Sequence, residues 1–372
     1  MSWHAGALGD VLTLKRGHDL PDSRRQDGDV PVVSSSGITG HHNVAKAKGP
    51  GVVTGRYGTI GEVFYLQEDY WPLNTSLYVT DFKGNHPRFA AYFLRNILAN
   101  YDSSKAAVPG VNRNVLHALP VTYPDITSQH RIADILSAYD DLIDNNRRRM
   151  ALLEGAARQI YQEWFVRLRF PNYEHTRIVS GVPEGWESKA LGDLCHEVRE
   201  SVDPDALEPD TPYIGLEHMP RRSITLNEWG SVDQVTSSKH RFRVGDILFG
   251  KIRPYFHKVG VAFMDGVASS DAIVIRPRDA RLHGLVLMTV SSDPFVAVTA
   301  QTMREGSKMP RADWKQMQAY PTPLPPEELL ARFGGIVQPM IHQLRTLTLA
   351  NQKLRAARDL LLPRLMSGEV SI

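Results

Sequence analysis

The stretch GRYGTIGEV, residues 55–63, has a glycine spacing that could cradle a phosphate group. A phosphate-binding loop of that kind is followed by a helix whose N-terminal N–H groups face the anion. Here the run EVFYL that begins inside the stretch is apolar and aromatic, and it predicts a strand. We therefore expect a turn that presents Arg56 and Tyr57, and no nucleotide site.

Three further patterns resemble parts of metal sites. HEVRE, residues 196–200, lacks the second histidine that would complete a zinc pair one helical turn later. HH at 41–42 has no carboxylate partner nearby, and the loose spacing of Asp69 and DFK at 81–83 is a weak match to a metal-dependent nuclease. The Asn/Asp-Pro-Pro-aromatic stretch that amino-methyltransferases use to hold a flipped base is also missing. We therefore expect a chain that is not an enzyme and holds no metal or cofactor.

Length and composition limit the fold and the compartment. At 372 residues the chain is long enough for two or three domains. Its single cysteine, Cys195, excludes an internal disulfide. The sequence has neither a long apolar run nor an N-terminal signal segment. These features favour a cytoplasmic protein with no membrane contact.

Basic residues are clustered although the formal net charge is only +2. Between residues 239 and 258, Lys and Arg side chains stand against a single acid, Asp246. Arg147, Arg148 and Arg149 form a second cluster. Local basic patches in a near-neutral chain suit contact with phosphate, and a solvated surface is the alternative.

The chain repeats itself. WHAGALGD at 3–10 and WESKALGD at 186–193 share the form W-x4-L-G-D. GRYGTIG matches GKIRPYFHKVG at 250–260, the strand-like SLYVT matches DAIVI, and Arg113 pairs with Arg311. The offset between the halves drifts in these strand-rich parts and stays constant in the helical part that follows. A repeat of this size indicates a duplicated domain and not a solenoid.

The helical part of each half carries a heptad seam, which needs a partner helix to bury it. The obvious partner is the helix of the other half. Asn146 and Asn351 would then be buried polar residues that fix the register, and Arg358 interrupts the second seam. The predicted helix-pair interface comprises Tyr139, Ile143, Asn146, Met150, Leu153, Ile160 and Trp164 with Leu344, Leu347, Asn351, Leu354, Leu361 and Leu365.

Prolines predict where these helices begin and end. PEE at 326–328 suits a first helical turn. Pro339 should interrupt the helix, which predicts a short helix at 328–337 and a long one at 340–366. The first half should have a matching long helix at 139–168. Each long helix would span roughly 40–45 Å, a little more than one turn of B-DNA.

The sequence therefore predicts an α+β protein with a tandem, pseudo-symmetric repeat. Two similar strand-rich heads would be separated by a long, antiparallel, coiled-coil-like helix pair. Such a molecule would bind two separated DNA half-sites at a fixed distance, as symmetric dimers do with two chains. Because the two heads differ in sequence, the half-sites should differ too.

In these features the chain resembles the specificity subunit of Type I restriction–modification enzymes. The resemblance rests on the two LGD openings, SQHRIADILSAYDDLIDNNRRRMALLEGAARQIYQEWFVRLRFP, the VPEGWE that starts the second half and the closing LLLPRLMSGEV. It covers nearly the whole chain. It implies target-recognition domains at 1–125 and 171–325, and helical spacer regions at 126–170 and 326–372.

The resemblance also implies partner subunits and a separate role for each of them. Each target-recognition domain would bind one half of a bipartite site in double-stranded DNA. The helices would set the gap and dock two modification subunits, and restriction subunits would carry the nuclease and motor. S-adenosylmethionine, ATP and Mg would be held by these partner subunits, and the specificity chain would catalyse nothing.

DNA contacts are expected from basic, amide and aromatic side chains, because phosphate contacts position a protein on the duplex. Arg56 and Lys251 follow a glycine at equivalent positions, and Arg113 and Arg311 occupy a later loop. Structural salt bridges are the alternative for each. The candidates are Lys46, Lys48, Arg56, Tyr57, Asn112 and Arg113 in the first half, and Lys239, Arg241, Lys251, Arg253, Tyr255, Lys258, Lys308 and Arg311 in the second.

Two other functions stay open at the level of sequence. A single-chain endonuclease–methyltransferase fragment would need catalytic motifs, and none of the patterns above is convincing. A decoy or scaffold that binds the modification partner without recognising DNA would carry the same docking helices.

Overall fold

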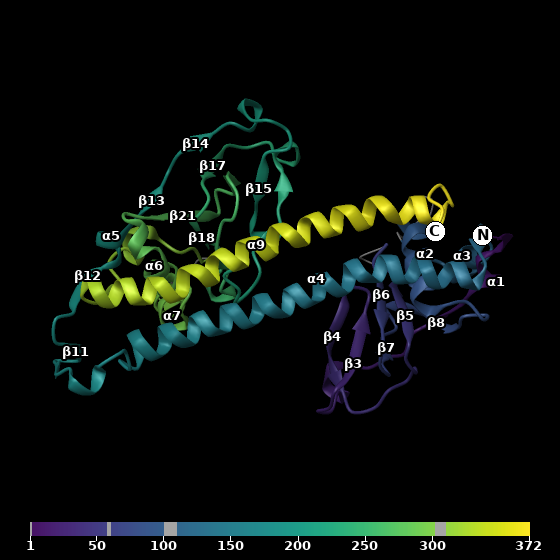
Figure 1. Cartoon of the computed structure of the whole chain (residues 1–372), viewed down its shortest axis with the longest axis horizontal. Helices are drawn as coiled ribbons and strands as arrows, with labels where there is room; N and C mark the ends of the chain where they lie inside the picture. The colour runs from purple at the N-terminus through teal and green to yellow at the C-terminus, as the bar shows by residue number, and fades with distance from the viewer. Residues whose placement is uncertain (1, 58–60, 100–109, 302–309) are drawn as a thin grey trace. The chain divides into compact units, whose positions relative to one another are not determined.

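The computed structural model describes residues 2–57, 61–99, 110–301 and 310–372. It contains helices and strands in two compact units (Figure 1). Unit 1 comprises Met1–Ile143 and Lys353–Ile372, and unit 2 comprises Asp144–Gln352. The two long helices, α4 (Ile126–Tyr161) and α9 (Glu327–Met366), each contribute residues to both units.

Unit 1 is built on small sheets. β1 pairs with β9, a four-stranded sheet has the order β2-β8-β5-β6, and a three-stranded sheet has the order β4-β3-β7. The elements are β1 (Trp3–Ala7), α1 (Leu8–Val11), β2 (Thr13–Arg16), β3 (Val30–Ser34), β4 (Gly37–His42), β5 (Gly51–Gly55), β6 (Val63–Leu66), β7 (Trp71–Pro72), β8 (Ser76–Asp81), α2 (Pro87–Ala99), α3 (Arg113–His117) and β9 (Pro120–Pro124).

Unit 2 repeats this topology with additions. β12 pairs with β22, and the order β13-β21-β18-β19 matches the four-stranded sheet of unit 1. The third sheet has five strands, β14-β17-β20-β15-β16. The elements are β10 (Ile178–Val179), β11 (Val182–Pro183), β12 (Glu187–Ala190), α5 (Leu191–Leu194), β13 (Cys195–Val198), β14 (Ser201–Val202), β15 (Pro212–Ile214), β16 (Gly230–Ser231), β17 (Lys239–Phe242), β18 (Ile247–Gly250), β19 (Val259–Val261), β20 (Gly266–Ala268), β21 (Ala272–Pro277), α6 (His283–Val290), α7 (Asp293–Gln301), α8 (Trp314–Met317) and β22 (Pro321–Leu324).

The strands expected at EVFYL, SLYVT and DAIVI are confirmed as β6, β8 and β21. In the third sheets, β3 pairs in parallel with β7, and β15 pairs in parallel with β20. The duplication seen in the sequence is therefore also present in the strand order. β14 and β17 of unit 2 extend its sheet beyond the repeated part.

The W-x4-L-G-D motif has the same structure at both places. Its leucine, Leu8 or Leu191, is fully buried. The aspartate side chain accepts a hydrogen bond from the backbone N–H three residues earlier, at 2.8 Å for Asp10 and 3.1 Å for Asp193. This bond satisfies an N–H at the start of a short helix, α1 or α5, which links two strands. The motif therefore recurs because each unit needs the same strand–helix–strand junction.

Each unit has its own apolar core. In unit 1, α2 buries Phe89 and Leu94 among the sheet residues, together with Leu136 of α4 and Leu365 of α9. In unit 2, α6 is buried on all sides, since every residue from Gly284 to Val290 is buried.

Within the described parts of the chain no single helix is long and apolar enough to cross a membrane, and only the bent pair at 280–290 and 293–301 meets that test jointly.

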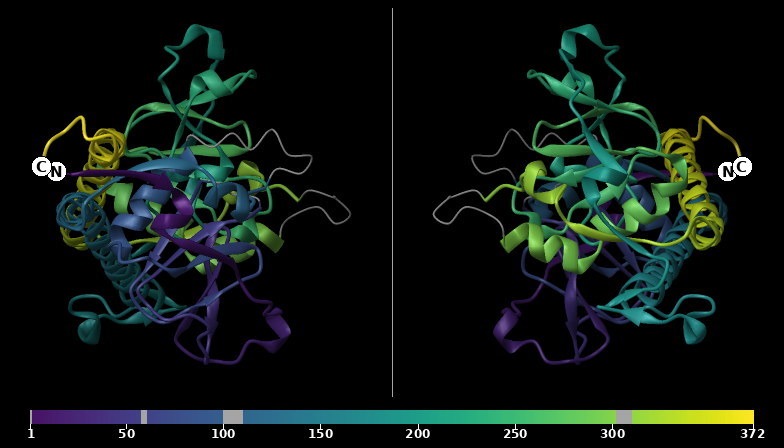
Figure 2. Two further views of the ribbon diagram at one scale, coloured as in Figure 1. Left: turned by 90° about the vertical axis from the view of Figure 1, so that its right-hand side faces the viewer. Right: turned by 90° about the vertical axis from the view of Figure 1, so that its left-hand side faces the viewer.

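The chain ends lie close together in unit 1, as Figures 1 and 2 both show. Arg131 donates a hydrogen bond to the carbonyl of Ile372 at 3.3 Å. Gly368, with φ at +76°, lies against the Trp3 ring, and a Cβ there would come within 2.7 Å of it. Glycine is needed at this position for both reasons.

Helix α4 begins earlier than the sequence predicted. The long helix was expected at 139–168, but α4 runs from Ile126 to Tyr161 and a π-helical turn, Gln162–Val166, follows it. Asp125 caps the start, because its carboxylate accepts the backbone N–H of Ser128 at 2.9 Å. No proline occurs between residues 126 and 166, so one helix runs from Ile126 through the start of the helix expected at 139–168.

The break expected at Pro339 is absent, and that prediction is wrong. α9 is continuous from Glu327 to Met366 and contains both the short and the long helix expected at 328–337 and 340–366. Pro339 is exposed, so the carbonyl that loses its N–H partner faces water. Phe333 and Val337 are fully buried on the opposite face and hold the helix against the core.

Candidate nucleic-acid interface

In unit 1 the structure joins two of the predicted loops. The backbone N–H of Val111 donates to the carbonyl of Arg56 at 2.9 Å, and Tyr57 forms an antiparallel bridge with Gly110. The Arg56 guanidinium carbon lies 4.6 Å from the centre of the Tyr57 ring, which is 42% exposed. Exposed Asn112 and Arg113 follow directly. Arg56, Tyr57, Asn112 and Arg113 therefore belong to one surface.

Unit 2 has the same junction. Ala312 donates its N–H to the carbonyl of Lys251 at 2.8 Å, and Arg253 donates its N–H to the carbonyl of Pro310 at 2.9 Å. Ile252 forms an antiparallel bridge with Arg311. Lys251, Arg253 and Arg311 are thereby brought together at the place that corresponds to Arg56 in unit 1.

The structure corrects one detail of the sequence alignment: Arg113 and Arg311 are not equivalent. Asn112 caps α3 by accepting the N–H of Asn114 at 2.9 Å, and Asp313 caps α8 by accepting the N–H of Lys315 at 3.0 Å. The caps fix the register, so Arg113 corresponds to Trp314. Arg311 corresponds to Gly110. Matching the two arginines by type shifted the register, because capping is satisfied by either Asn or Asp.

The remaining candidates of unit 1 lie between β4 and β5. Lys46 and Lys48 are both exposed. The Lys46 ammonium lies 5.3 Å from the centre of the Trp71 ring. This contact orients the lysine without removing it from solvent.

Lys239 does not fit the predicted role. Only 5% of its surface is exposed, and its ammonium donates to the carbonyl and hydroxyl of Ser237 at 2.6 and 2.7 Å. A cation held this way stabilises a turn and is not presented to a phosphate. Arg241 lies 3.5 Å from Glu200, an exposed pair. Lys308 lies outside the described residues.

Lys258 is partly withdrawn from solvent. Its ammonium donates to the carbonyl of Leu216 at 2.5 Å. Burial, with the nearby positive charge of Arg221, lowers the pKa of Lys258. Tyr255, by contrast, is 53% exposed.

Sequence reasoning missed Arg221 and Phe256. The Arg221 guanidinium carbon lies 4.1 Å from the centre of the Phe256 ring, and that of Arg253 lies 5.8 Å from it. Arg221 belongs to a loop far from Phe256 in sequence, so only the fold reveals the contact. The pattern Pro-Tyr-Phe after a basic residue was the one local signal.

Residues of the predicted helix-pair interface also make contacts within each unit. In unit 2, the Asn146 amide donates to the Asn351 side-chain carbonyl at 2.8 Å, and both residues are buried. Trp164 lies 5.8 Å from Phe333 between ring centres. From Asn146 in α4 to Trp164 in the π-helical turn that follows it, residue numbers rise while those of the contacted residues fall along α9, so the segments are antiparallel here. Other buried seam residues in unit 2 are Met150, Leu344 and Leu347, with Leu153, Ile160 and Trp164 partly buried against them.

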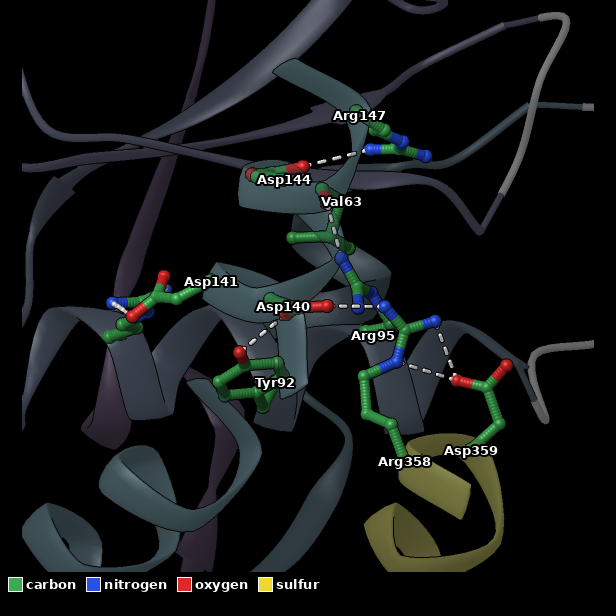
Figure 3. A network of polar contacts seen from close by, with 10 residues as sticks. Val63, Tyr92, Arg95, Asp140, Asp141, Asp144, Arg147, Arg358 and Asp359 are labelled. Atoms are coloured by element: carbon green, nitrogen blue, oxygen red, sulfur yellow. Dashed lines mark hydrogen bonds and ion pairs between the residues drawn. The ribbon is translucent and has the colours of Figure 1, made fainter. Parts of the chain in front are cut away.

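In unit 1, Arg358 has a partner. It forms an ion pair with Asp140 of α4, and Asp140 also accepts the Tyr92 hydroxyl at 2.5 Å (Figure 3). Burial and this hydrogen bond raise the pKa of Tyr92. The residue that interrupts the seam therefore connects α9, α4 and α2. Ile143 and Leu365 are buried in unit 1, while Tyr139 and Leu361 are partly buried, as is Leu354.

Within the described residues, the sequence patterns that resemble metal sites are not brought together into one. Residues 196–198 of HEVRE lie in strand β13, not on a helix. His42 accepts a hydrogen bond from the backbone of Gln26 at 3.0 Å, and Lys83 pairs with Asp81 at 2.8 Å. Across the described ranges, no group of three or more His, Cys, Asp or Glu residues is placed to hold a metal ion.

Comparison with known proteins agrees with this architecture. Residues 2–154 match the family model of the Type I restriction modification DNA specificity domain. The chain is 21% identical over 296 residues to the Type I restriction enzyme MjaIX specificity subunit of Methanocaldococcus jannaschii. That match covers 73% of this chain and 65% of the relative, so the chain spans less than two thirds of its length. It is also 25% identical over 150 residues to the EcoDI specificity subunit of Escherichia coli, covering 39% of this chain and 32% of that protein.

A solved structure shares the fold. The S subunit of a Type I restriction–modification system from M. genitalium superposes with a TM-score of 0.60 at 14% identity, over 98% of this chain and 96% of that one. At this identity the likeness shows the fold, while the match to the DNA specificity domain model is to residues 2–154. The resemblance to the specificity subunits of these enzymes is confirmed.

Proposed function

We propose that this chain is the DNA-recognition subunit of a Type I restriction–modification complex. Each unit would bind one half of a bipartite site in double-stranded DNA. One observation carries this proposal: in both units the same backbone junction brings a basic loop after a glycine against a capped helix, at Arg56 with Val111 and at Lys251 with Ala312. A duplicated surface with basic side chains suits two separate contacts with one duplex.

The two surfaces differ in the side chains they offer. Unit 1 presents Arg56 and Tyr57, whereas unit 2 presents Lys251, Arg253 and Tyr255 on a longer loop. Base edges are distinguished by the type and geometry of the contacting groups. Two unlike surfaces would therefore recognise two unlike half-sites.

We also propose the finer arrangement. Residues 1–125 and 171–325 would act as target-recognition domains, and 126–170 and 326–372 as helical spacers that set the gap as an antiparallel pair. Support comes from the Asn146–Asn351 contact in unit 2 and the Asp140–Arg358 contact in unit 1. The spacers would dock two modification subunits, and restriction subunits would join the complex. These partners would hold S-adenosylmethionine, ATP and Mg and carry out methylation and cleavage in the cytoplasm.

Substituting the exposed arginines tests the DNA contacts. In the chain assembled with its modification subunit, Arg113→Ala and Arg311→Ala should each weaken binding to target duplex and make it less salt-dependent, by about one phosphate contact. Arg281→Ala is the control, because it removes the same charge from an exposed ion pair with Asp279. Wild-type affinity and salt slope in both variants would contradict these assignments. Assembly without any DNA binding by the wild type would indicate a decoy.

A further inference from the structure

Two guanidinium groups share one aromatic ring in unit 2. Arg221 and Arg253 both lie within cation–π distance of Phe256, at 4.1 and 5.8 Å. Tyr255 packs edge-on against the same ring at 5.0 Å between centres. Both arginines are exposed, and neither guanidinium has a hydrogen-bond or ion-pair partner within the residues the structure describes.

The backbone around this ring is held in an unusual conformation. Arg253 and His257, which flank the 3-10 turn η8 (Pro254–Phe256), have φ of +50° and +53°. Arg222 also has a positive φ, +56°, and donates its N–H to the His257 carbonyl at 2.9 Å. Such strain at non-glycine residues persists only where the surroundings enforce it, and it concentrates at ligand-binding sites.

Hydrogen bonds from neighbouring residues hold this backbone conformation in place. His257 is 3% exposed, and its Nε2 lies 2.9 Å from the carbonyl oxygen of Ser291. On the other side, Glu154 of α4 accepts hydrogen bonds from the Ser223 hydroxyl at 2.7 Å and the Ile224 N–H at 3.2 Å. One turn later, Arg158 donates to the Arg222 carbonyl at 2.7 Å. Helix α4 therefore fixes the loop that carries Arg221.

The charges also point to an anionic ligand. Arg221 and Arg253 are like charges beside one ring, and Arg221 also lies near the positive charge of Lys258. Like charges at close range repel, and an anion bound among them removes the repulsion. A guanidinium stacked on a ring keeps its plane fixed, so its edge is prepared for two parallel hydrogen bonds to a phosphate or a guanine.

We propose that Arg221 and Arg253, both within cation–π distance of Phe256, form a DNA-contact site of unit 2, and that Glu154 is the positioning residue that holds it. The proposal rests on the proposed function, and it adds residues that the repeat does not reveal. Unit 1 has a shorter loop between its matching glycines. The site therefore belongs to the half-site that unit 2 contacts.

The test uses the full chain assembled with its modification subunit and duplexes that carry single-base changes in either half of the target. Arg221→Ala and Phe256→Leu should each lower affinity about fivefold or more, or abolish discrimination at one base pair. Both variants should change binding in the same half of the target that Arg311→Ala affects, the half contacted by unit 2. Arg281→Ala is again the charge-matched control, and melting temperatures check folding.

The outcomes separate the two proposals. If wild type prefers the bipartite duplex but Arg221→Ala and Phe256→Leu equal the control in affinity and discrimination, this inference fails and the proposed function stands. If wild type shows no preference for the bipartite duplex over a scrambled one, the proposed function fails and this inference fails with it.

Glu154 needs a different measurement, since it does not face the duplex in this proposal. Glu154→Ala should relax base preference in the half contacted by unit 2 and leave the other half unchanged. Glu154→Gln, which keeps an acceptor oxygen, should restore part of that preference. Equal changes in both halves, or none, would overturn the positioning role.

Discussion

The buried amide pair Asn146–Asn351 is the residue-scale feature that the heptad pattern predicted best. Both residues were expected inside the seams, and the structure joins them directly at 2.8 Å. The pattern was informative because burial follows helical periodicity. Lys239 was predicted from the clustering of basic residues to contact DNA, but it is buried at the start of β17, where no helical periodicity reports on exposure.

Replacing one member of this pair should cost stability. Asn351→Leu leaves the Asn146 amide buried without its partner, which costs about 1–3 kcal/mol in the free energy of unfolding. The double variant Asn146→Leu with Asn351→Leu should recover that loss or exceed wild type, because an apolar pair packs without a polar penalty. Urea unfolding of the wild type, the single variant and the double variant checks this. A double variant as unstable as the single one would contradict the pairing.

At the scale of elements, helices α4 and α9 show what sequence rules miss. Helical periodicity and the PEE start located them, but the rule that proline ends a helix misplaced the boundary at Pro339. The rule describes an isolated helix, whereas packing of Phe333 and Val337 in the core of unit 2 outweighs the lost hydrogen bond. Tertiary contacts of this kind cannot be read from local sequence.

The continuous helix makes Pro339→Ala a stabilising change. Alanine restores one backbone hydrogen bond and removes the ring, which is worth up to about 3 kcal/mol in a helix interior. The melting temperature should rise. Pro171→Ala, in an exposed loop, serves as the control and should give no gain. A loss of stability on Pro339→Ala would show that the helix is broken there.

The spacer role of these helices predicts a change in target geometry. Inserting one heptad into both helices, between residues 143 and 144 and between 352 and 353, lengthens each by about 10 Å. The gap between the half-sites should grow by about three base pairs. The measurement is the methylated motif of the lengthened chain. An unchanged gap would remove the spacer interpretation.

At the scale of the whole molecule, the repeat was predictable and the sheet pairing was not. The LGD motif and the strand stretches recur along the chain, so the duplication can be recognised from the sequence alone. The parallel pairings β3–β7 and β15–β20 join segments far apart in sequence, and no local pattern reports them. The same limit applies to the candidate interface. The basic residues after each glycine were identified from the sequence. The Arg221–Phe256 contact was not, because it forms only where the fold brings two loops together.

The most direct measurement is a methylation map of DNA from cells that make this chain with its modification subunit, compared with cells that make the modification subunit alone. Two units with the same topology and different loops predict a split motif, with two unlike halves and a constant gap, that appears only when this chain is present. A single unbroken motif would contradict the account. So would a complex that assembles but adds no methylation.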